Sequence, residues 1–506
     1  MKEGKVYLIG AGPGDPGLIT LKGIECIEKA DVVVYDYLAN PKLLEYRKED
    51  AELIYVGKKG GDHTCSQSHI NSIIIQRAKA GKVVARIKGG DPFIFGRGGE
   101  EAQEMAEEQV RFEIVPGVTS AISVPAYAGI PLTHRDFTST VAFITGHERP
   151  KKGKSAIDWS KISTGIGTLV FLMGVKNLPE IVSNLTENGR DPKTPVAIIR
   201  WGTLGKQDTL IGNLETIVEL GAKRNFVPPA IIIVGEVVKL RDELNWFETK
   251  PLFGRRIAVT RARGQASEFS KLLREHGAEP IEFPTIKVTS PESFDALDEA
   301  IDNLESYDWL ILTSSNGVRF FLERLKVRDR DIRDLKGIKI CAIGPGTAGE
   351  IEKLAIKVDF VPTEYRAEAI VDGLKISGIK GKNFLLPRAE EAREVLPREI
   401  RNFGGSVDVV TAYRSVTPIN DREKMKDLLK EGKIDLITFT SSSTVRNFTE
   451  IFDGDEVTSL IKGITVASIG PITAETAGNL GIKTVIMPKK YTIAALTEAI
   501  VSYFSR

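Results

Sequence analysis

Three segments rich in glycine and proline could form a binding site in this chain of 506 residues. They are Gly10-Ala11-Gly12-Pro13-Gly14-Asp15-Pro16, residues 88–101 and residues 116–121, and each follows a short apolar run. Glycine at such a corner lets the backbone approach a ligand closely, or simply makes a tight turn. The first segment departs from the dinucleotide fingerprint G-x-G-x-x-G, because Asp15 replaces the third glycine and Pro13 lacks an N–H. The segments therefore predict a ligand that is not bound through a phosphate.

Hydroxyl-rich segments mark the second half of the chain. They are Thr313-Ser314-Ser315-Asn316 with Thr440-Ser441-Ser442-Ser443, and Gly344-Pro345-Gly346-Thr347 with Gly470-Pro471-Ile472-Thr473. Each follows an apolar run and precedes a stretch that is typical of a helix. Backbone N–H groups and hydroxyls at such a place can bind an anion, or the hydroxyls can cap the helix.

Short runs rich in Val and Ile position these segments. They recur at residues 30–35, 82–87, 168–173 and 230–234, among others, and each precedes a glycine-containing turn and a polar helical stretch. This alternation predicts an α/β fold built on buried, mainly parallel sheets.

Two breaks and an internal repeat predict the domains. The basic segment 148–154 predicts a linker inside the first half, and the segment 247–254 precedes a fresh strand at 256–260. Beyond it, Thr260-Arg261-Ala262 recurs as Pro387-Arg388-Ala389, Thr313-Ser314-Ser315 as Thr440-Ser441-Ser442, and Ile343-Gly344-Pro345 as Ile469-Gly470-Pro471, at offsets of 127, 127 and 126 residues. We therefore predict two similar α/β lobes with a ligand cleft between them. The predicted domains are 1–246, with subdomains 1–147 and 155–246, then a linker at 247–253, and 254–506.

Composition predicts a globular protein that acts on small molecules. Hydrophobic residues make up 42% and charged residues 27%, which is enough apolar material for packed cores. The formal net charge is +1, with 69 basic and 68 acidic side chains, so the basic footprint of a nucleic-acid-binding protein is missing. The apolar run at 5–10 is too short for a signal peptide or a membrane span. We predict a cytoplasmic protein with no nucleic-acid or membrane partner.

Cysteine and histidine are sparse. Cys26, Cys65 and Cys341 are far apart and odd in number, which favours a reducing compartment over a disulfide framework. The segment His63-x-Cys65-x3-His69 contains metal-ligand types, but no second ligand group follows at a useful spacing. We predict no metal site.

Further motifs in the first half are Phe171-Leu172-Met173-Gly174, Pro195-x-Ala197-x4-Gly202-Thr203-x3-Gln207 and residues 229–238. With the glycine-rich segments, they resemble the tetrapyrrole methylase family over residues 1 to about 245, and within it the uroporphyrinogen-III C-methyltransferases. The resemblance implies two α/β subdomains that bind S-adenosylmethionine in a cleft and methylate uroporphyrinogen III twice, to precorrin-2. The implied cofactor contacts are Pro13, Gly89, Gly90, Asp91, Ile94, Thr119, Ser120, Met173 and Gly202.

The same resemblance implies catalytic and substrate-binding residues. Asp36 and Lys58 match positions with base and acid roles, whereas without the resemblance Asp36 is a helix cap and Lys58 a solvated charge. Arg97 and Arg135 are candidate cations for the carboxylates of the substrate. Periodicity alone makes Met173 a core residue. Because the family is usually dimeric, we predict a homodimer formed through this half.

Further motifs in the second half are Val361-Pro362-Thr363-Glu364-Tyr365-Arg366-Ala367, Leu386-Pro387-Arg388-Ala389 and Val409-Val410-Thr411-Ala412-Tyr413-Arg414. With the paired hydroxyl segments, they resemble uroporphyrinogen-III synthase over about 254–506. The resemblance implies cyclisation of hydroxymethylbilane to uroporphyrinogen III, with inversion of the last pyrrole ring and no cofactor. It also implies exchanged lobes, 254–288 plus 417–506 and 289–416, joined by hinge strands near 283–288 and 409–415.

Candidate residues in this half follow from the match. Tyr413 corresponds to a tyrosine proposed to assist departure of the hydroxyl group, although a buried structural role is the alternative. Ser314, Thr347, Ser443 and Thr473 are the candidate substrate contacts.

Two other functions stay open. One is methylation of another tetrapyrrole intermediate, of a modified protein histidine or of ribosomal RNA, and the near-neutral charge argues against RNA. The other makes the second half a non-catalytic module that binds a tetrapyrrole or a sugar.

Overall fold

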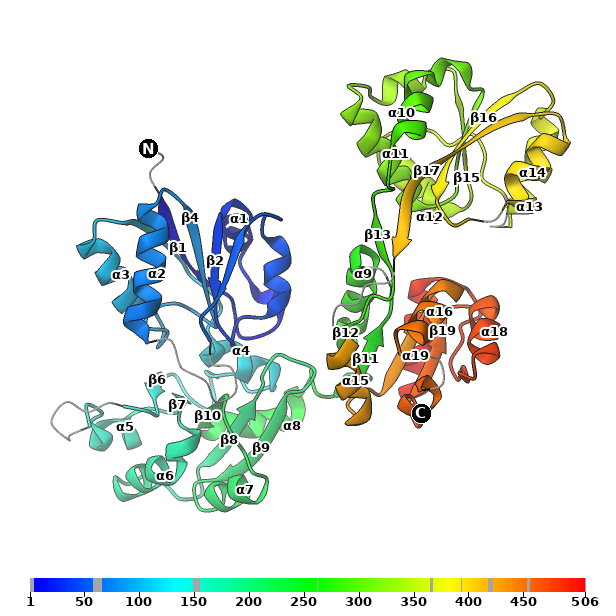
Figure 1. Cartoon of the computed structure of the whole chain (residues 1–506). Helices are drawn as coiled ribbons and strands as arrows, with labels where there is room; N and C mark the ends of the chain where they lie inside the picture. The colour runs from blue at the N-terminus through cyan, green and yellow to red at the C-terminus, as the bar shows by residue number, and fades with distance from the viewer. Residues whose placement is uncertain are drawn as a thin grey trace. The chain divides into compact units, whose positions relative to one another are not determined.

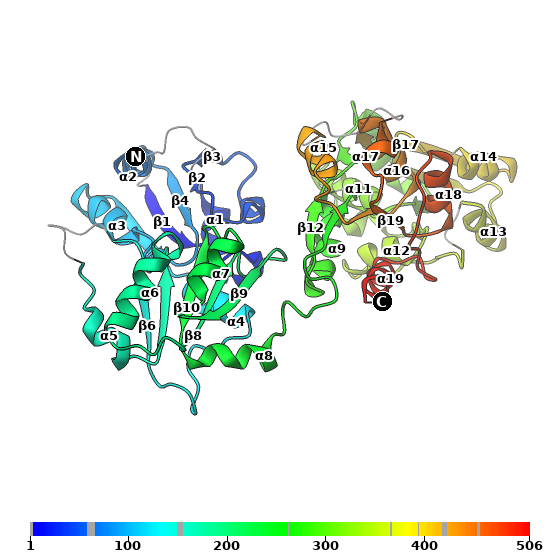
Figure 2. The same ribbon diagram turned by 90° about the horizontal axis from the view of Figure 1, so that it is seen from below.

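The computed structural model describes residues 4–57, 66–148, 155–261, 263–364, 367–392, 394–416, 422–452 and 456–505. Its strands form four sheets with helices packed on them (Figure 1, Figure 2), which confirms the predicted α/β class. The chain divides into two compact units, Met1–Arg256 with Leu273–Glu279 and Val501–Arg506, and Ile257–Leu272 with Pro280–Ile500. The segment 247–253 belongs to the first unit.

The first sheet is parallel throughout, in the order β3-β2-β4-β1-β5. Its region contains β1 (Lys5–Gly10), α1 (Leu21–Lys29), β2 (Val32–Tyr35), β3 (Glu52–Tyr55), α2 (Gln67–Lys79), β4 (Val83–Lys88), α3 (Gly98–Glu107) and β5 (Arg111–Val115). Alternate strand residues point to opposite faces. Leu8 and Val34 therefore pack with α2 and α3, whereas Ile9 and Val33 pack with α1. Helices thus cover both faces of the sheet, as Figure 1 shows.

The second sheet is mixed, so the expectation of mainly parallel sheets is wrong here. Its order is β6-β7-β10-β8-β9, in which β6 and β7 are parallel and the other neighbours are antiparallel. Its region contains α4 (Ser120–Tyr127), β6 (Val141–Thr145), α5 (Trp159–Gly165), β7 (Thr168–Leu172), α6 (Leu178–Glu187), β8 (Pro195–Arg200), β9 (Asp208–Asn213), α7 (Ile217–Lys223), β10 (Ala230–Val234) and α8 (Arg241–Leu244). A hairpin joins β8 to β9, and a hairpin needs no crossover helix. An apolar run alone does not reveal the direction of its strand.

Helix α4 joins the two subdomains of the first half. It begins shortly after β5 of the first sheet, but Ala121, Val124 and Ala128 pack in the core of the second sheet. Its first turn therefore lies beside the first sheet, while its body belongs to the second core.

Two sheets with matching elements make up the second half. The order β12-β11-β18-β19 combines β11 (Arg256–Val259) and β12 (Glu279–Glu282) with β18 (Leu436–Phe439) and β19 (Thr465–Ser468). The order β13-β17-β16-β14-β15 combines β13 (Lys287–Thr289), β14 (Trp309–Leu312), β15 (Lys339–Ala342), β16 (Asn383–Ala389) and β17 (Ser406–Val416). The offsets of the sequence repeat also relate β14 to β18 and β15 to β19. The duplication is therefore present in the structure as well as in the sequence.

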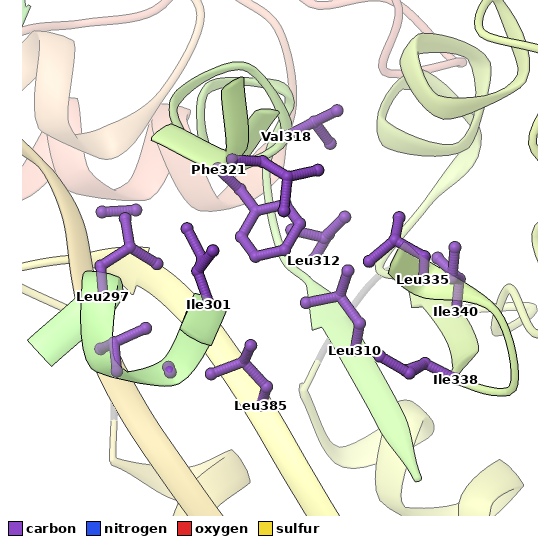
Figure 3. Packing of buried hydrophobic residues seen from close by; sticks show 14 of the residues in the cluster. Leu297, Ile301, Leu310, Leu312, Val318, Phe321, Leu335, Ile338, Ile340 and Leu385 are labelled. Atoms are coloured by element: carbon purple, nitrogen blue, oxygen red, sulfur yellow. The ribbon is translucent and has the colours of Figure 1, made fainter. Parts of the chain in front are cut away.

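Helices complete both lobes of the second half. They are α9 (Arg263–Glu275), α10 (Asp295–Asp302), α11 (Ser315–Val327), α12 (Pro345–Glu352), α13 (Ala367–Ser377), α14 (Val395–Asn402), α15 (Arg422–Lys430), α16 (Ser442–Ile451), α17 (Val457–Leu460), α18 (Pro471–Asn479) and α19 (Ile493–Phe504). Figure 3 shows one core, in which Ile301 of α10, Phe321 of α11 and Leu310 of β14 point toward one another. Between the lobes, β13 pairs with β17 in antiparallel register, with Val288 opposite Ser415.

Candidate active sites

Three glycine corners meet at the carboxyl edge of the first sheet. Because β1, β4 and β5 are parallel, the loops that follow them leave at the same edge. A Cβ on Gly10 would lie 2.5 Å from the Cα of Gly117, and a Cβ on Gly117 would lie 2.4 Å from the carbonyl oxygen of Gly90. Gly90 also has a left-handed φ of 71°. A side chain at Gly10 or Gly117 would push the loops apart, and the left-handed φ of Gly90 strains any other residue, so glycine is favoured at all three corners.

Asp91 ties two of these loops together. Its Oδ2 accepts a hydrogen bond from the N–H of Gly117 at 3.0 Å. Its Oδ1 accepts from the N–H groups of Phe93 and Ile94 at 2.8 and 3.1 Å. The carboxylate predicted to bind a cofactor therefore already orders the loops that would surround one.

The loop after β1 also contacts the second subdomain. The N–H of Asp15 donates to Thr203 Oγ1 at 3.0 Å, and Tyr127 donates from its hydroxyl to Asp15 Oδ2 at 2.8 Å. A Cβ on Gly14 would lie 3.1 Å from the side chain of Leu204. The Pro13 loop and the loop that contains Gly202 are thus brought together.

Thr119, Ser120 and Gly202 lie around α4. Thr119 caps this helix by accepting from the N–H of Ala121 at 3.3 Å. The N–H of Ser120 would lie 3.7 Å from a Cβ on Gly90. A Cβ on Gly202 would lie 2.4 Å from the side chain of Val124, so close packing on α4 also explains this glycine. The structure therefore gathers these predicted residues with the glycine corners.

Met173 and Ile94 are exposed apolar side chains. Met173 follows β7, and half of it, 51%, is exposed, which overturns the interpretation of a core residue. Its φ is 58°, a left-handed value that is unusual outside glycine and concentrates at functional sites. Ile94 is 37% exposed in the loop ordered by Asp91.

Asp36 follows β2 at the same carboxyl edge. Its Oδ1 accepts from the N–H of Leu38 at 3.1 Å, and its Oδ2 accepts from Arg86 Nη2 at 3.1 Å. The Asp36 side chain is 26% exposed and that of Arg86 is 4% exposed. Asp36 is therefore not a helix cap but a partly exposed carboxylate anchored to a buried cation. The other predicted catalytic residue of this half, Lys58, lies outside the described residues.

A buried charge network extends from Arg86. Lys88 Nζ donates to Glu101 Oε1 at 2.7 Å, Gln67 Nε2 donates to the same oxygen at 2.9 Å, and Arg86 Nε lies 3.5 Å from it. Burial, together with the charge of Arg86, lowers the pKa of Lys88 against the opposing effect of Glu101. The sequence prediction missed this network. The sequence feature that could have revealed the network is the pair of cations Arg86 and Lys88 in an otherwise apolar strand.

The candidate substrate cations Arg97 and Arg135 are exposed. Arg97 begins α3 in a left-handed conformation and pairs with Glu100 on the surface. Arg135 is exposed in the segment between α4 and β6.

A hollow of about 520 Å³ lies between the end of α4 and the region of α8. It is lined by Ala126, Gly129, Ile130, Pro131, Glu243, Leu244, Asn245 and Trp246.

In the second half, Tyr413 and Ser314 meet at the carboxyl edge of one lobe. Their hydroxyl oxygens lie 2.9 Å apart, and Ser314 also accepts from the N–H of Gly317 at the start of α11. The Tyr413 ring stacks on Phe320 with centroids 5.7 Å apart. Burial raises the pKa of Tyr413, against the effect of the Ser314 hydrogen bond. Tyr413 thus keeps its proton to higher pH while it lies beside a polar corner.

The candidate threonines occupy equivalent places in the two lobes. Thr347 and Thr473 lie in the first turns of α12 and α18 and are 6% and 5% exposed. The N-cap residues of these helices, Gly344 and Gly470, make no side-chain cap. Ser443 is instead exposed inside α16. Both lobes therefore present backbone N–H groups without a capping side chain, next to a buried hydroxyl.

Within the described parts of the chain, no group of three or more His, Cys, Asp or Glu side chains could hold a metal ion. His63 and Cys65 fall outside those parts. Cys26 and Cys341 are buried free thiols, and burial raises the pKa of Cys341 to about 12. No described helix is long and apolar enough to span a membrane.

The fold is that of an α/β protein whose two halves are built from different sheets. A family model described as Tetrapyrrole (Corrin/Porphyrin) Methylases matches residues 5–218, and one described as Uroporphyrinogen-III synthase HemD matches residues 267–498. The chain belongs to the tetrapyrrole methylases in its first half and to the HemD uroporphyrinogen-III synthases in its second, as the resemblance predicted.

Individual relatives agree with this assignment. The porphyrin biosynthesis protein HemD of Ruminiclostridium josui is 37% identical over 489 residues, which cover 97% of this chain and 96% of the relative. A uroporphyrinogen-III C-methyltransferase of Bacillus subtilis is 51% identical over 247 residues, covering 49% of this chain and 96% of the relative. The S-adenosyl-L-methionine-dependent uroporphyrinogen III methyltransferase of Methanosarcina barkeri is 52% identical over 241 residues, covering 48% of this chain and 94% of the relative.

Proposed function

We propose that the chain is a bifunctional enzyme of tetrapyrrole biosynthesis. Its second half cyclises hydroxymethylbilane to uroporphyrinogen III, and its first half methylates that product twice with S-adenosylmethionine, to precorrin-2. The observation that carries the proposal is the meeting of Gly10, Gly90 and Gly117 beside a carboxylate anchored to a buried arginine. Relatives named for the methyltransferase match the first half, and a HemD protein matches the whole chain.

The first half fits S-adenosylmethionine. Glycine corners that admit no Cβ leave backbone N–H and C=O groups for a polar ligand, and the exposed Ile94 and Met173 offer apolar walls. Thr119 and Ser120 add hydroxyl groups at the start of α4. When bound, the cofactor supplies an electrophilic methyl group. The predicted cofactor residues remain proposals for this chain.

Asp36 is the proposed base of the methyltransferase half. Two hydrogen bonds fix its carboxylate, one from Leu38 and one from Arg86, while about a quarter of the side chain stays accessible. Transfer of the methyl group to a fully substituted pyrrole carbon leaves a positive charge on the macrocycle, and a fixed, accessible carboxylate can accept the proton that the macrocycle then loses from another position. Lys58 is the proposed acid, by the family match alone.

The synthase half needs orientation more than strong acids or bases. The first turns of α12 and α18 offer N–H groups that suit substrate carboxylates. Tyr413, which burial keeps protonated, can donate a hydrogen bond to a departing hydroxyl group. We propose that these residues hold the linear substrate while it closes.

One assay tests both activities. The full chain is incubated with hydroxymethylbilane and S-adenosylmethionine, and the products are separated by chromatography and identified by mass spectrometry. We expect a cyclic type III product with two added methyl groups. A doubly methylated product formed only from added uroporphyrinogen III would refute the synthase half, and an unmethylated type III product would refute the methyltransferase half.

Two wider expectations stay predictions. A homodimer formed through the methyltransferase half is tested by light scattering of the full chain. A cytoplasmic location is tested by cell fractionation.

A further inference from the structure

The hairpin loop 201–207, which contains the predicted cofactor residue Gly202, has a strained backbone. Trp201 and Thr203 have left-handed φ values of 50° and 70°. Such conformations cost free energy in residues other than glycine, and they persist only where the surroundings fix them. Thr203 and Gln207 are 3% and 4% exposed, so buried contacts hold the loop.

A continuous set of hydrogen bonds runs from this loop to the segment predicted as a linker. The N–H of Thr203 donates to Gln207 Oε1 at 2.9 Å, and Gln207 Nε2 donates to Glu248 Oε1 at 2.8 Å. Thr209 donates to the same Glu248 oxygen at 2.5 Å, and Arg241 binds the other oxygen. Glu248 therefore accepts from two residues at the carboxyl end of the hairpin loop, Gln207 and Thr209, and is itself fixed by a cation.

The other side of the loop contacts the glycine corner. Thr203 Oγ1 accepts from the N–H of Asp15, and Asp15 in turn accepts from Tyr127. The Tyr127 ring packs edge-on against Trp246 and Phe247, at 5.0 and 4.8 Å between centroids. The Pro13 loop is thus held to the hairpin loop, and both contact the segment around Glu248.

We propose that Glu248 is a positioning residue for the cofactor site, although it lies beyond the residues that carry the methyltransferase motifs. It fixes Gln207, Gln207 fixes the strained Thr203, and Thr203 fixes the loop at Asp15. This proposal rests on the proposed function, because it assumes that the loops 13–15 and 201–207 bind S-adenosylmethionine.

The test compares affinities for S-adenosylhomocysteine by calorimetry on the full chain. Glu248→Gln keeps the size but removes the charged acceptor of three side-chain donors, so we expect about tenfold weaker binding. Turnover at saturating S-adenosylmethionine should stay within threefold of the wild type. Glu243→Gln is the matched control, because Glu243 is exposed on α8 and loses the same charge. The double variant Gln207→Glu with Glu248→Gln exchanges the two side chains, so that position 248 donates and position 207 accepts. This variant should recover most of the affinity.

Outcomes separate the two hypotheses. A wild type that does not bind S-adenosylhomocysteine refutes the proposed function. A wild type that binds, with Glu248→Gln within twofold of it, refutes only the positioning role, even if the thermal midpoint of the variant falls. Hydrogen exchange of the wild type adds a check that needs no variant. Bound S-adenosylhomocysteine should slow exchange in 245–253 as well as in 201–207, and protection confined to 201–207 would refute the coupling.

Discussion

The exchange of Asp91 for asparagine tests whether this carboxylate orders the glycine loops. In the wild type, one oxygen accepts from Phe93 and Ile94 and the other from Gly117. Asparagine has one carbonyl oxygen, so it best keeps the two bonds in its own loop and turns its NH₂ group toward the N–H of Gly117. One charge-assisted hydrogen bond is lost, and two donors then face each other.

The expected cost follows from the type of bond. A hydrogen bond to a charged group contributes about 1.5–3 kcal/mol, and the partial exposure of Asp91 favours the lower figure of about 1.5 kcal/mol. Since about 1.4 kcal/mol corresponds to tenfold in an equilibrium constant, the loops should open roughly ten times more often. Affinity for S-adenosylhomocysteine would fall by at most the same factor, because the closed fraction limits the apparent affinity.

Hydrogen exchange with mass spectrometry measures this opening directly. Peptides that span 89–96 and 115–121 should exchange about tenfold faster in Asp91→Asn, and the rest of the sheet should be unchanged. Asp50→Asn is the control, because Asp50 is exposed and the variant makes the same change in charge. If both peptides exchanged within twofold of the wild type, the hydrogen bonds of Asp91 would not order the loops. A loss of affinity without faster exchange would then assign Asp91 to direct contact with the cofactor.

Three further variants test other parts of the chain. Asp36→Asn should lower the methyl-transfer rate at least about a hundredfold, as expected for loss of a general base. Calorimetry should show unchanged affinity for S-adenosylhomocysteine. A wild-type rate would refute the role of Asp36 as base. Tyr413→Phe keeps the ring and should lower turnover of hydroxymethylbilane about tenfold with little change in thermal midpoint, and full activity would leave a structural role only. Hydrogen bonds from Lys22 and Lys5 lower the pKa of Glu113 to about 2, so its stabilising effect is present above the unfolded pKa of about 4.3 and is lost as the pH falls toward 2. The difference in thermal midpoint between wild type and Glu113→Gln should therefore shrink between pH 6 and pH 3, and a constant difference would contradict the pairing.

The glycine corners were predictable because their signal is local. Glycine and proline gather directly after short apolar runs at Gly10, Gly90 and Gly117, so the corners were visible in the sequence, although the contacts that exclude a Cβ at Gly10 and Gly117 come from the neighbouring loops. The duplicated lobes were predictable for a similar reason, since the repeat keeps the order of its elements. Both features depend on residues that are close in the chain or equally spaced along it.

The partners of side chains were not predictable in the same way. From the sequence alone Asp36 is interpreted as a helix cap, whereas in the structure it accepts a hydrogen bond from Arg86 of a neighbouring strand. The antiparallel strands of the second sheet look like any other apolar runs, because their direction is set by the hairpin that joins β8 to β9. Met173 has the apolar character of a core residue, and only its backbone conformation and exposure show otherwise.

The division of the first half into two subdomains explains why its site depends on residues far apart in sequence. Helix α4 begins beside the glycine corners of one sheet and packs in the core of the other. The loops 13–15 and 201–207 meet next to it, through Asp15 and Thr203. A ligand held by both loops would therefore bind most tightly when the two subdomains keep one relative position. A contact between the subdomains, such as the hydrogen bond from Tyr127 to Asp15, would then affect affinity without touching the ligand.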